Sequence, residues 1–232
     1  MPVLPGSSPD LPPVEITLRR SARARRFSLR VSRLDGRVTL SLPLRARESE
    51  AMAFARAQEG WIRDTLAQMP RQAGVGLGAQ VPGEGRMLTL VAGPGRAVRI
   101  EGDRMLIPGD PAQAGVRAGA FLKALARERL VAASDRYAGL IGRKVTRVTL
   151  RDTRSRWGSC AHDGALMYSW RLVMAPPSVL DYVAAHEVAH MLEMNHSADF
   201  WAVVERLYPR WQPQRKWLHD EGQALHAYRF GD

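Results

Sequence analysis

The sequence has almost no cysteine, no long apolar run and no dense block of charge. Cys160 is its single cysteine, so an intrachain disulfide is excluded and a reducing compartment is favoured. No uncharged apolar run approaches the roughly 18 residues that a membrane helix needs, so no membrane span is expected. The first residues lack a basic segment followed by an apolar one, and a secretory signal is not expected. We therefore expect a cytoplasmic protein.

Basic residues exceed acidic ones: 34 Lys and Arg against 23 Asp and Glu give a net charge of +11. Such an excess favours nucleic acid or other anionic partners. The alternative is a solvated surface with scattered charges, because no run of five or six basic residues occurs. One basic cluster ahead of a predicted hairpin leaves two interpretations open, a nucleic-acid patch or a loop and edge strand kept soluble by charge. This cluster comprises Arg19, Arg20, Arg23, Arg25 and Arg26.

Strand patterns dominate the first half of the chain. Residues 1–13, rich in proline, serine and glycine, are predicted to form a disordered lead-in. Residues 14–110 are predicted to be β-rich with one amphipathic helix, at 48–68. The Asp35-Gly36 pair between two alternating runs predicts a hairpin. The predicted strands are 14–18, 27–31, 38–42, 87–91, 97–100 and 104–107.

Helical patterns dominate residues 111–232. A long helix is predicted at 111–141, because apolar residues recur on one face and Gly142 can end it. A further helix is predicted after two adjacent prolines, with Ser178 as its N-cap and Asp181 in the capping-box position. The remaining predicted elements are strands at 145–150 and 165–172 and helices at 198–207 and 213–227.

The most specific pattern lies on the helix that follows the two prolines. It is the HExxH sequence His186-Glu187-Val188-Ala189-His190. Residues four apart on a helix lie one above the other, so His186 and His190 can point at one metal ion. Zinc suits this set, because imidazole is a good zinc ligand and catalytic zinc has three protein ligands and an open position. Glu187 would lie beside the ion, where it could take a proton from a metal-activated water.

The third ligand has two candidates. His196 stands six residues after His190, and Asn195 before it tolerates a left-handed turn that would swing the histidine back. Glu205 on the following predicted helix is the other candidate, because some metallopeptidases of this kind use a downstream glutamate. The histidine is the favoured ligand of the two.

Three segments in this order resemble the YgjP-like metal-dependent hydrolases, which are zincin-type metallopeptidase domains. They are RSRWGSC at 154–160, WRLVMAPPSVLDYVAAHEVAH at 170–190 and NHSADFW at 195–201. At the HExxH and third-histidine core, these hydrolases are similar to the WLM and SprT-like proteases. The resemblance implies an α+β fold. In that fold a zincin-like metallopeptidase domain of helices and a small antiparallel sheet, at 111–232, follows a β-rich N-terminal part.

The resemblance also implies the chemistry. The ligands of one Zn²⁺ ion per chain would be His186, His190 and His196, and Glu187 would be the general acid/base. The substrate would be a peptide or protein, hydrolysed at an amide bond. Two alternatives stay open. One is a nucleic-acid-associated protease, motivated by the charge of +11. The other is a non-catalytic binding module with a structural metal held by four protein ligands.

Four further residues are candidates for substrate binding or support: Arg154, Arg156, Trp157 and Asp199. Either arginine could bind a substrate carboxylate, stabilise an oxyanion, or form a structural pair with Asp152 or Asp181. Trp157 could cover the site or pack beneath it. Asp199 could accept a hydrogen bond from a ligand histidine, or it could be a helix N-terminal charge beside a Ser197 cap.

The strand at 154–160 or that at 165–172 could be an edge that receives an extended substrate, with Gly158 allowing close backbone approach. Cys160 could be a fourth metal ligand, a redox switch or a small buried residue. Two tyrosines are candidate electrophilic helpers, Tyr168 and Tyr182. Three histidines have no partner at metal spacing and are expected at the surface: His162, His219 and His226.

Overall fold

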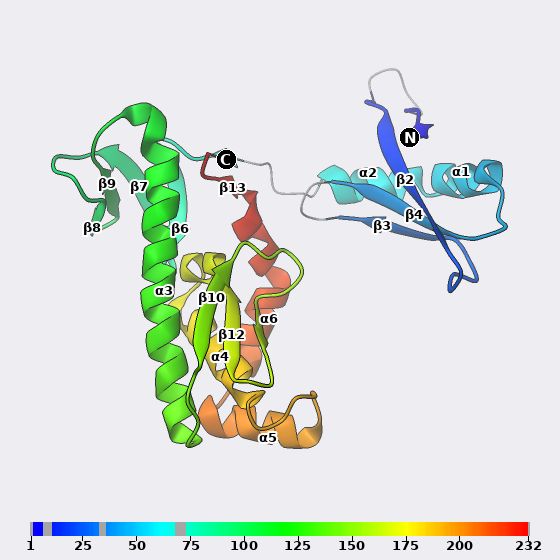
Figure 1. Cartoon of the computed structure of the whole chain (residues 1–232). Coiled ribbons are helices and arrows are strands. Elements are labelled where there is room, and N and C mark those ends of the chain that lie inside the picture. The colour runs from blue at the N-terminus through cyan, green and yellow to red at the C-terminus, as the bar shows by residue number, and fades with distance from the viewer. Residues whose placement is uncertain (1, 7–10, 33–35, 68–72, 232) are drawn as a thin grey trace. The chain divides into compact units, whose positions relative to one another are not determined.

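The computed structural model describes residues 2–6, 11–32, 36–67 and 73–231. The chain divides into two compact units, Met1–Arg71 and Gln72–Asp232, which we call the N-terminal and C-terminal units (Figure 1). Helices and small sheets make up both units, so the predicted α+β class is confirmed. The division after Arg71 differs from the predicted one at 110, because strands between 80 and 107 share a core with the C-terminal helices.

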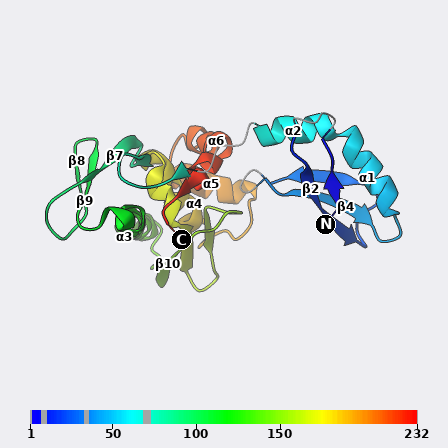
Figure 2. The ribbon, with the colours of Figure 1, turned by 90° about the horizontal axis from the view of Figure 1, so that it is seen from above.

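The N-terminal unit is a four-stranded sheet covered by two helices. Its strands, in the order β1-β2-β4-β3, are β1 Val3–Leu4, β2 Val14–Ser21, β4 Val38–Pro43 and β3 Ser28–Val31. β4 runs parallel to β2 and antiparallel to β3. Helices α1 (Glu48–Ala57) and α2 (Glu59–Ala67) lie along one side of the sheet (Figure 2). Buried residues between them form a separate core: Leu4, Ile16, Val31, Val38, Leu40, Leu42, Ala51, Met52, Ala55 and Ile62.

Three sequence predictions for this unit compare with the structure as follows. The lead-in predicted to be disordered contains β1, which pairs with β2 because Leu4 is fully buried there. The helix predicted at 48–68 is two helices. The chain tightens at Gln58, whose N–H donates to the Ala55 carbonyl at 3.1 Å. The predicted pairing of β3 with β4 is present, while Asp35 of the predicted turn lies outside the described residues.

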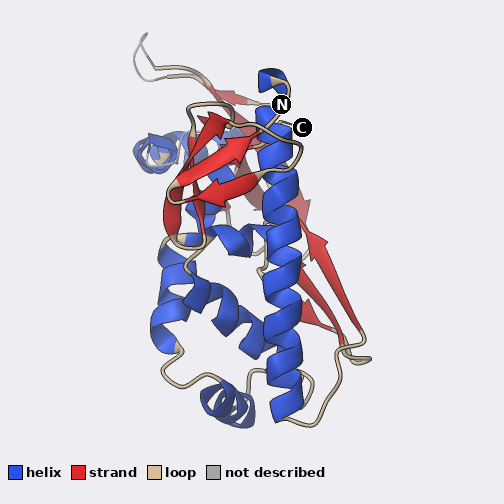
Figure 3. Cartoon of the chain, turned by 90° about the vertical axis from the view of Figure 1, so that its left-hand side faces the viewer, coloured by secondary structure: helices blue, strands red, loops and turns tan. Residues whose placement is uncertain are grey.

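In the C-terminal unit a second four-stranded sheet packs against a long helix. In the order β6-β7-β9-β8, its strands are β6 Gln80–Gly83, β7 Arg86–Ala92, β9 Arg104–Ile107 and β8 Arg99–Glu101. After the 3-10 segment η1 (Pro111–Gln113), helix α3 (Ala114–Leu140) runs beside the shorter helices and strands (Figure 3). Among the described helices, none combines the length and the apolar character needed to cross a membrane.

A three-stranded sheet carries one wall of the candidate site. In the order β10-β12-β11, its strands are β10 Arg147–Arg151, β12 Ala165–Ser169 and β11 Gly158–Cys160. β12 runs parallel to β10 and antiparallel to β11, so the sheet is mixed and not wholly antiparallel as the resemblance implies. Among the described strands β11 pairs with β12 alone, so β11 is an edge strand.

The remaining elements follow β12 in the chain, except β5, which precedes the second sheet. They are η2 Trp170–Met174, α4 Pro177–Ala189, α5 Ala198–Leu207, α6 Gln212–Asp220, η3 Gly222–Ala227 and the parallel pair of β13 Tyr228–Arg229 with β5 Ala73–Gly74. The strand predicted at 165–172 therefore ends at Ser169, and the helix predicted at 213–227 is divided between α6 and η3.

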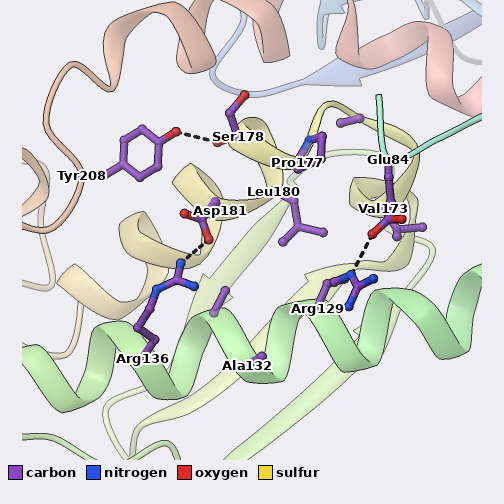
Figure 4. A pocket seen from close by; sticks show the side chains of 12 residues that line it. Glu84, Arg129, Ala132, Arg136, Val173, Pro177, Ser178, Leu180, Asp181 and Tyr208 are labelled. Atoms are coloured by element: carbon purple, nitrogen blue, oxygen red, sulfur yellow. Dashed lines mark hydrogen bonds and ion pairs between the residues drawn. The ribbon is translucent and has the colours of Figure 1, made fainter. Parts of the chain in front are cut away.

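Helix α4 lies inside this core. Its apolar residues occupy several faces, which is typical of a buried helix: Val179, Leu180, Val183, Ala184, Ala185 and Val188. The helix begins at Pro177 and not after a Ser178 cap as predicted, because the fixed φ of proline suits the first helical turn. Asp181 closes no capping box. Its carboxylate instead accepts hydrogen bonds from Arg136 (Figure 4) and, at 2.6 Å, from the Tyr137 hydroxyl, both on α3.

Close packing at the start of α3 generates a stability prediction. A Cβ at Gly115 would lie 2.2 Å from the Val75 carbonyl oxygen, whereas a Cβ at Gly139 on the same helix would meet nothing within 4 Å. Gly115→Ala should lower the free energy of unfolding by about 1–3 kcal/mol through overpacking. Gly139→Ala should raise it by up to about 1 kcal/mol through helix propensity. Urea unfolding of both variants measures the difference, and a Gly115→Ala protein at least as stable as wild type would contradict the close approach.

Candidate metal centre

Three imidazoles converge where α4 ends. His186 lies in the last turn of α4 and His190 is its C-cap residue, while His196 follows on the segment that leads into α5. One nitrogen from each ring lies within 4.8 Å of the other two, and the Nε2 atoms of His186 and His196 are 3.2 Å apart. Within the described part of the chain, these three residues are the one group of His, Cys, Asp or Glu with such spacing.

The segment that carries His196 turns back without the left-handed residue predicted at Asn195. Among described residues other than glycine, only Glu84 and Arg210 have a positive φ. The end of α4 is tightened by the Leu192 N–H, which donates to the Ala189 carbonyl at 3.0 Å. Next, Asn195 Oδ1 accepts from the backbone N–H of Ser197 at 2.9 Å. The turn that brings His196 back is therefore stabilised by the Asn195 side chain and not by a left-handed backbone conformation.

Aromatic rings enclose the three histidines. The ring of Phe200, fully buried on α5, lies 4.9, 4.4 and 4.7 Å between centroids from His186, His190 and His196 respectively. Trp201 lies on His196 at 5.8 Å and stacks on Trp211 at 4.3 Å. The Ser197 hydroxyl caps α5 by accepting from the Phe200 N–H at 3.3 Å, as predicted for Ser197. The cap fixes where α5 begins and thus where Phe200 enters the core.

The surroundings of the rings favour neutral imidazoles with free lone pairs. Burial, with His190 and His196 nearby, lowers the pKa of His186 to about 3, and burial also lowers the pKa of His190. His190 Nδ1 lies 2.9 Å from the Glu193 carbonyl oxygen, so Nδ1 carries the proton and Nε2 is left as an electron-pair donor. His186 Nδ1 is buried and has no hydrogen-bond partner in the described part of the chain.

This donor set fits a zinc ion. Tetrahedral zinc with bonds of about 2.0–2.1 Å to nitrogen places two ligand nitrogens about 3.3 Å apart, close to the 3.2 Å between His186 and His196 Nε2. Two neutral Nε2 atoms that face each other across this distance repel unless a proton or cation lies between them. The 3.2 Å separation, together with the convergence of the His190 ring, suits a cation shared by the three imidazoles.

Glu187 follows His186 on α4 and lies against the edge strand. Its side chain is buried, with the residue only 5% exposed, and burial raises the pKa of its carboxyl to about 8 against the opposing charge of Arg156. A Cβ at Gly158 of β11 would lie 2.4 Å from Glu187 Oε1. Glycine at this position therefore makes room for the carboxylate, a reason for Gly158 that complements the predicted close approach of a substrate backbone.

The free edge of β11 borders Glu187. Ser169 N–H donates to the Trp157 carbonyl at 2.8 Å and Ala161 N–H donates to the Ala165 carbonyl at 2.9 Å. Because antiparallel pairing alternates along a strand, the N–H and C=O groups of Gly158 and Cys160 point away from β12. Of the two predicted edge strands, 154–160 therefore contains the edge at β11, and 165–172 contains the central strand β12.

Arg154 and Arg156, the predicted partners of Asp152, do not pair with it and are both exposed. Arg171 binds Asp152 with Nε to Oδ1 at 2.7 Å and Nη2 to Oδ2 at 3.0 Å. The Arg171 guanidinium holds the pKa of Asp152 below its usual value, although burial alone would raise it. Arg171 Nη1 also donates to the Leu225 carbonyl at 2.8 Å, which ties the loop before β11 to the end of the chain.

Trp157 packs and does not cover the ligands. Its ring lies on His226 at 5.3 Å, and a Cβ at Gly222 would come within 2.9 Å of it. The prediction that His226 lies at the surface is wrong, because its side chain is only 5% exposed. This burial and the nearby Arg171 lower its pKa to about 4. The other two histidines expected at the surface, His162 and His219, are exposed.

The remaining candidates lie outside the group of three imidazoles. Asp199 is exposed in the first turn of α5, and the carbonyl of Glu193 takes the hydrogen bond to a site histidine that Asp199 could have accepted. Glu205 is exposed on α5 and accepts from the Arg210 N–H at 3.3 Å. Cys160 is half-buried, and burial raises the pKa of its thiol to about 11.

The two candidate tyrosines have structural contacts. The Tyr168 hydroxyl is 2.9 Å from that of Ser134, deep in the core, and burial raises the Tyr168 pKa. Tyr182 stacks on Trp211 at 6.3 Å, and burial raises its pKa to about 12. Neither arrangement presents an acidic hydroxyl to a substrate.

Sequence patterns missed three residues around the centre. Phe200 lies in the quoted segment 195–201, but nothing in the pattern shows that its ring touches all three histidines. Arg171 reaches partners far away in the sequence, so no local signal could have found its role. Arg215 lies over Trp201 at 4.9 Å and over Trp211 at 5.7 Å. The four-residue spacing of Trp211 and Arg215 on one helix is a local signal for this contact.

Two pockets lie in the C-terminal unit, one of them beside the histidines. A cleft of about 520 Å³ borders His190 and is lined by residues of 142–144, 161–164 and 190–194. A second pocket, of about 430 Å³, lies between α3 and the start of α4 and contains none of the three histidines (Figure 4). Its floor includes Ala132 and Leu180, and ion pairs of Arg129 with Glu84 and of Arg136 with Asp181 border it.

Comparison with known proteins completes this description. A search of curated proteins gave no match. Among solved structures, the crystal structure of the metallopeptidase zymogen of Pyrococcus abyssi abylysin is similar over 40% of this chain and 95% of that chain, with 17% identity and a TM-score of 0.37. The family described as YgjP-like, metallopeptidase domain, matches residues 25–221. This match covers most of the sequence, and the chain therefore belongs to the YgjP-like metallopeptidase family.

Proposed function

We propose that this protein is a zinc-dependent peptidase that hydrolyses an amide bond in a peptide or protein. Family membership supports metal-dependent hydrolysis. The observation that carries the finer proposal is the buried Glu187 carboxylate, on the helix that carries two of the three convergent imidazoles and against the edge strand β11. The single half-buried cysteine is compatible with the cytoplasmic location expected from the sequence.

The metal would be held by His186, His190 and His196. In the described residues no fourth His, Cys, Asp or Glu joins this group, so a coordination position would stay open. An open position favours a catalytic metal over the structural metal of a non-catalytic binding module. When bound, zinc lowers the pKa of water to about 7 and polarises a substrate carbonyl.

Glu187 supplies the proton transfer. It accepts a proton from the attacking water and then donates this proton to the leaving amine. Among the described residues, no ion pair or hydrogen bond fixes its carboxylate, so the same group can serve the water first and the amine later. The charge of Arg156 acts on Glu187, which favours Arg156 over Arg154 for stabilising negative charge on the reacting carbonyl oxygen.

The substrate would bind as an added strand. The outward N–H and C=O groups of Gly158 and Cys160 offer backbone hydrogen bonds to an extended peptide beside β11. Such bonds are independent of side-chain identity and hold the scissile amide close to Glu187. The cleft beside His190 would take residues beyond the cleaved bond.

The choice between His196 and Glu205 is testable by metal binding. His196→Ala should weaken zinc binding by more than about 100-fold, since losing a ligand should exceed the roughly 10- to 100-fold effect of losing an outer partner. Glu205→Ala, a change in an exposed residue of α5, should leave zinc affinity unchanged. Competition with a chromogenic chelator measures both affinities. The opposite pattern would make Glu205 the third ligand.

The role of Glu187 is testable by separating binding from turnover. Glu187→Gln should keep zinc affinity within a few-fold of wild type, because the carboxylate is not among the ligating groups. It should lower kcat by at least about 100-fold, through loss of general acid/base catalysis. Cleavage of a fluorogenic peptide library, with zinc content measured in the same samples, gives both values. Wild-type turnover by the zinc-loaded variant would refute the mechanism.

The contact between Gly158 and Glu187 predicts a change that leaves the metal ligands untouched. Gly158→Ala would place a Cβ 2.4 Å from Oε1 and displace the carboxylate. A displacement of about 1 Å can cost about 100-fold in rate, so kcat should fall by that order while zinc affinity stays unchanged. Ser159→Ala, the next residue of β11, is the matched control and should retain activity. Equal activities of the two variants would show that Glu187 does not depend on the space at Gly158.

A further inference from the structure

The N-terminal unit carries more positive charge for its length than the rest of the chain. Residues 1–71 contain 13 arginines, no lysine and 7 acidic residues, a net charge of 13 − 7 = +6. Residues 72–232 contain the other 21 basic and 16 acidic residues, a net charge of 21 − 16 = +5 in more than twice the length. The excess therefore concentrates in the unit that contains none of the metal-site residues.

The strand order gathers these arginines at one end of the sheet. Parallel strands β2 and β4 end side by side, at Ser21 and Pro43, and β3 begins at the same end, where Ser28 pairs with Ser41. The loops 22–27 and 44–47 both leave from this end (Figure 1). Six arginines lie on or next to these loops: Arg20, Arg23, Arg25, Arg26, Arg45 and Arg47.

A hydrogen-bonded contact holds the two loops together. Arg20 Nη1 donates to the carbonyl oxygens of Leu44 and Ala46, at 2.8 Å each. These bonds hold the 44–47 loop beside the end of β2. The 22–27 loop begins directly after the last residue of β2, Ser21. The cluster is therefore built by contacts across the sheet and is not a feature of one flexible stretch. Four of the five arginines noted in the sequence are part of it, and the fifth, Arg19, precedes Arg20 on β2.

The uncovered face of the sheet extends this positive end. Side chains alternate along β2 and β4, so Ile16, Val38 and Leu40 face the helices. The residues between them in each strand face the opposite side of the sheet. Across the three longest strands, one row on that other face is Arg19, Ser41 and Ser28, and the next is Thr17, Thr39 and Arg30. Arg19, Ser28 and Arg30 are exposed, and the other three are half-exposed. The face thus offers guanidinium and hydroxyl groups, with Glu15, Val3 and Pro43 toward its margins.

No carboxylate of the described residues pairs with the arginine side chains of this end and face. Among the described residues of the N-terminal unit, the one ion pair within 4.0 Å joins Arg63 to Glu59, away from this end of the sheet. In the C-terminal unit, by contrast, several arginines are paired: Arg99, Arg129, Arg136 and Arg171. The exposed guanidinium groups of Arg23, Arg25 and Arg26 are therefore available to an external anion.

We propose that this arginine-rich end and the adjoining sheet face bind the phosphodiester backbone of a nucleic acid. Arginine suits this ligand, because its planar guanidinium forms paired hydrogen bonds with phosphate oxygens, and serine or threonine hydroxyls add to them. Several such groups spread over two loops and three strands match a polymer of regularly spaced phosphates. The nearest aromatic ring, Phe27, packs on Phe54 at 5.7 Å and is not presented for base stacking. Binding should therefore be independent of base sequence and strongly salt-dependent.

A charge-matched pair of variants tests the proposal in the full chain. Arg23→Ser/Arg25→Ser/Arg26→Ser removes three exposed loop arginines, and Arg86→Ser/Arg96→Ser/Arg104→Ser removes three exposed arginines of the C-terminal unit. Fluorescence anisotropy measures binding to a labelled single-stranded oligonucleotide and to a duplex, each as DNA and as RNA, between 50 and 200 mM salt (roughly the range over which phosphate contacts are lost).

Wild type should bind at low salt, and its affinity should fall steeply as salt rises. The loop variant should bind at least about 10-fold more weakly at low salt, and its log–log salt slope should be shallower by about 2–3, one for each lost phosphate contact. The control variant should bind like wild type, although its net charge changes equally.

Three outcomes would overturn the proposal. They are no binding at low salt, an equal loss in both variants, and tighter binding to phosphatidylglycerol vesicles than to any oligonucleotide, which would assign the surface to membranes. Repeating the measurement with Glu187→Gln separates this proposal from the peptidase assignment. The Glu187→Gln protein should bind the oligonucleotides like wild type, because its substitution lies in the C-terminal unit. Nucleic-acid binding can therefore be confirmed even if the catalytic role of Glu187 is refuted.

Discussion

Burial of α4 sets the conditions for the polar groups that this helix brings to the metal centre. The helix carries two imidazoles and a carboxylate into a core of alanine, valine and leucine side chains. Polar groups in such surroundings need partners, since an unpaired buried group costs free energy. The Glu193 carbonyl satisfies His190, while the facing Nε2 atoms of His186 and His196 lie 3.2 Å apart, a spacing that suits a shared cation. The same burial raises the pKa of Glu187 and makes it a stronger base than an exposed glutamate.

The opposite wall of the centre depends on the last residues of the chain. Arg171 joins Asp152, in the loop before β11, to the Leu225 carbonyl, and Trp157 packs on His226 and Gly222. These contacts position Gly158, and Gly158 in turn leaves the space that the Glu187 carboxylate occupies. The geometry of the site is therefore set jointly by α4, by β11 and by the 3-10 segment η3, which lies far from both in sequence.

Local sequence patterns predicted the parts of the structure that depend on local geometry. The four-residue spacing of His186 and His190 placed both on one helix face, and alternating runs located most strands. Long-range features escaped prediction. The bidentate Arg171–Asp152 pair and the burial of His226 arise only when distant segments meet. The boundary predicted at 110 missed that β6, β7 and β9 complete the core around α3, because a run of strands beside a run of helices does not reveal which elements pack together.

The third imidazole, that of His196, is less firmly held by the fold than the other two. His186 and His190 are fixed by α4, whereas His196 is exposed on the segment before α5. An ion bound by all three would close only a short loop, and closing a short loop restricts the unfolded chain little. Phe200 holds α5 in the core by its own burial. Metal exchange would therefore need only a local opening of the 191–197 segment, with both helices remaining in place.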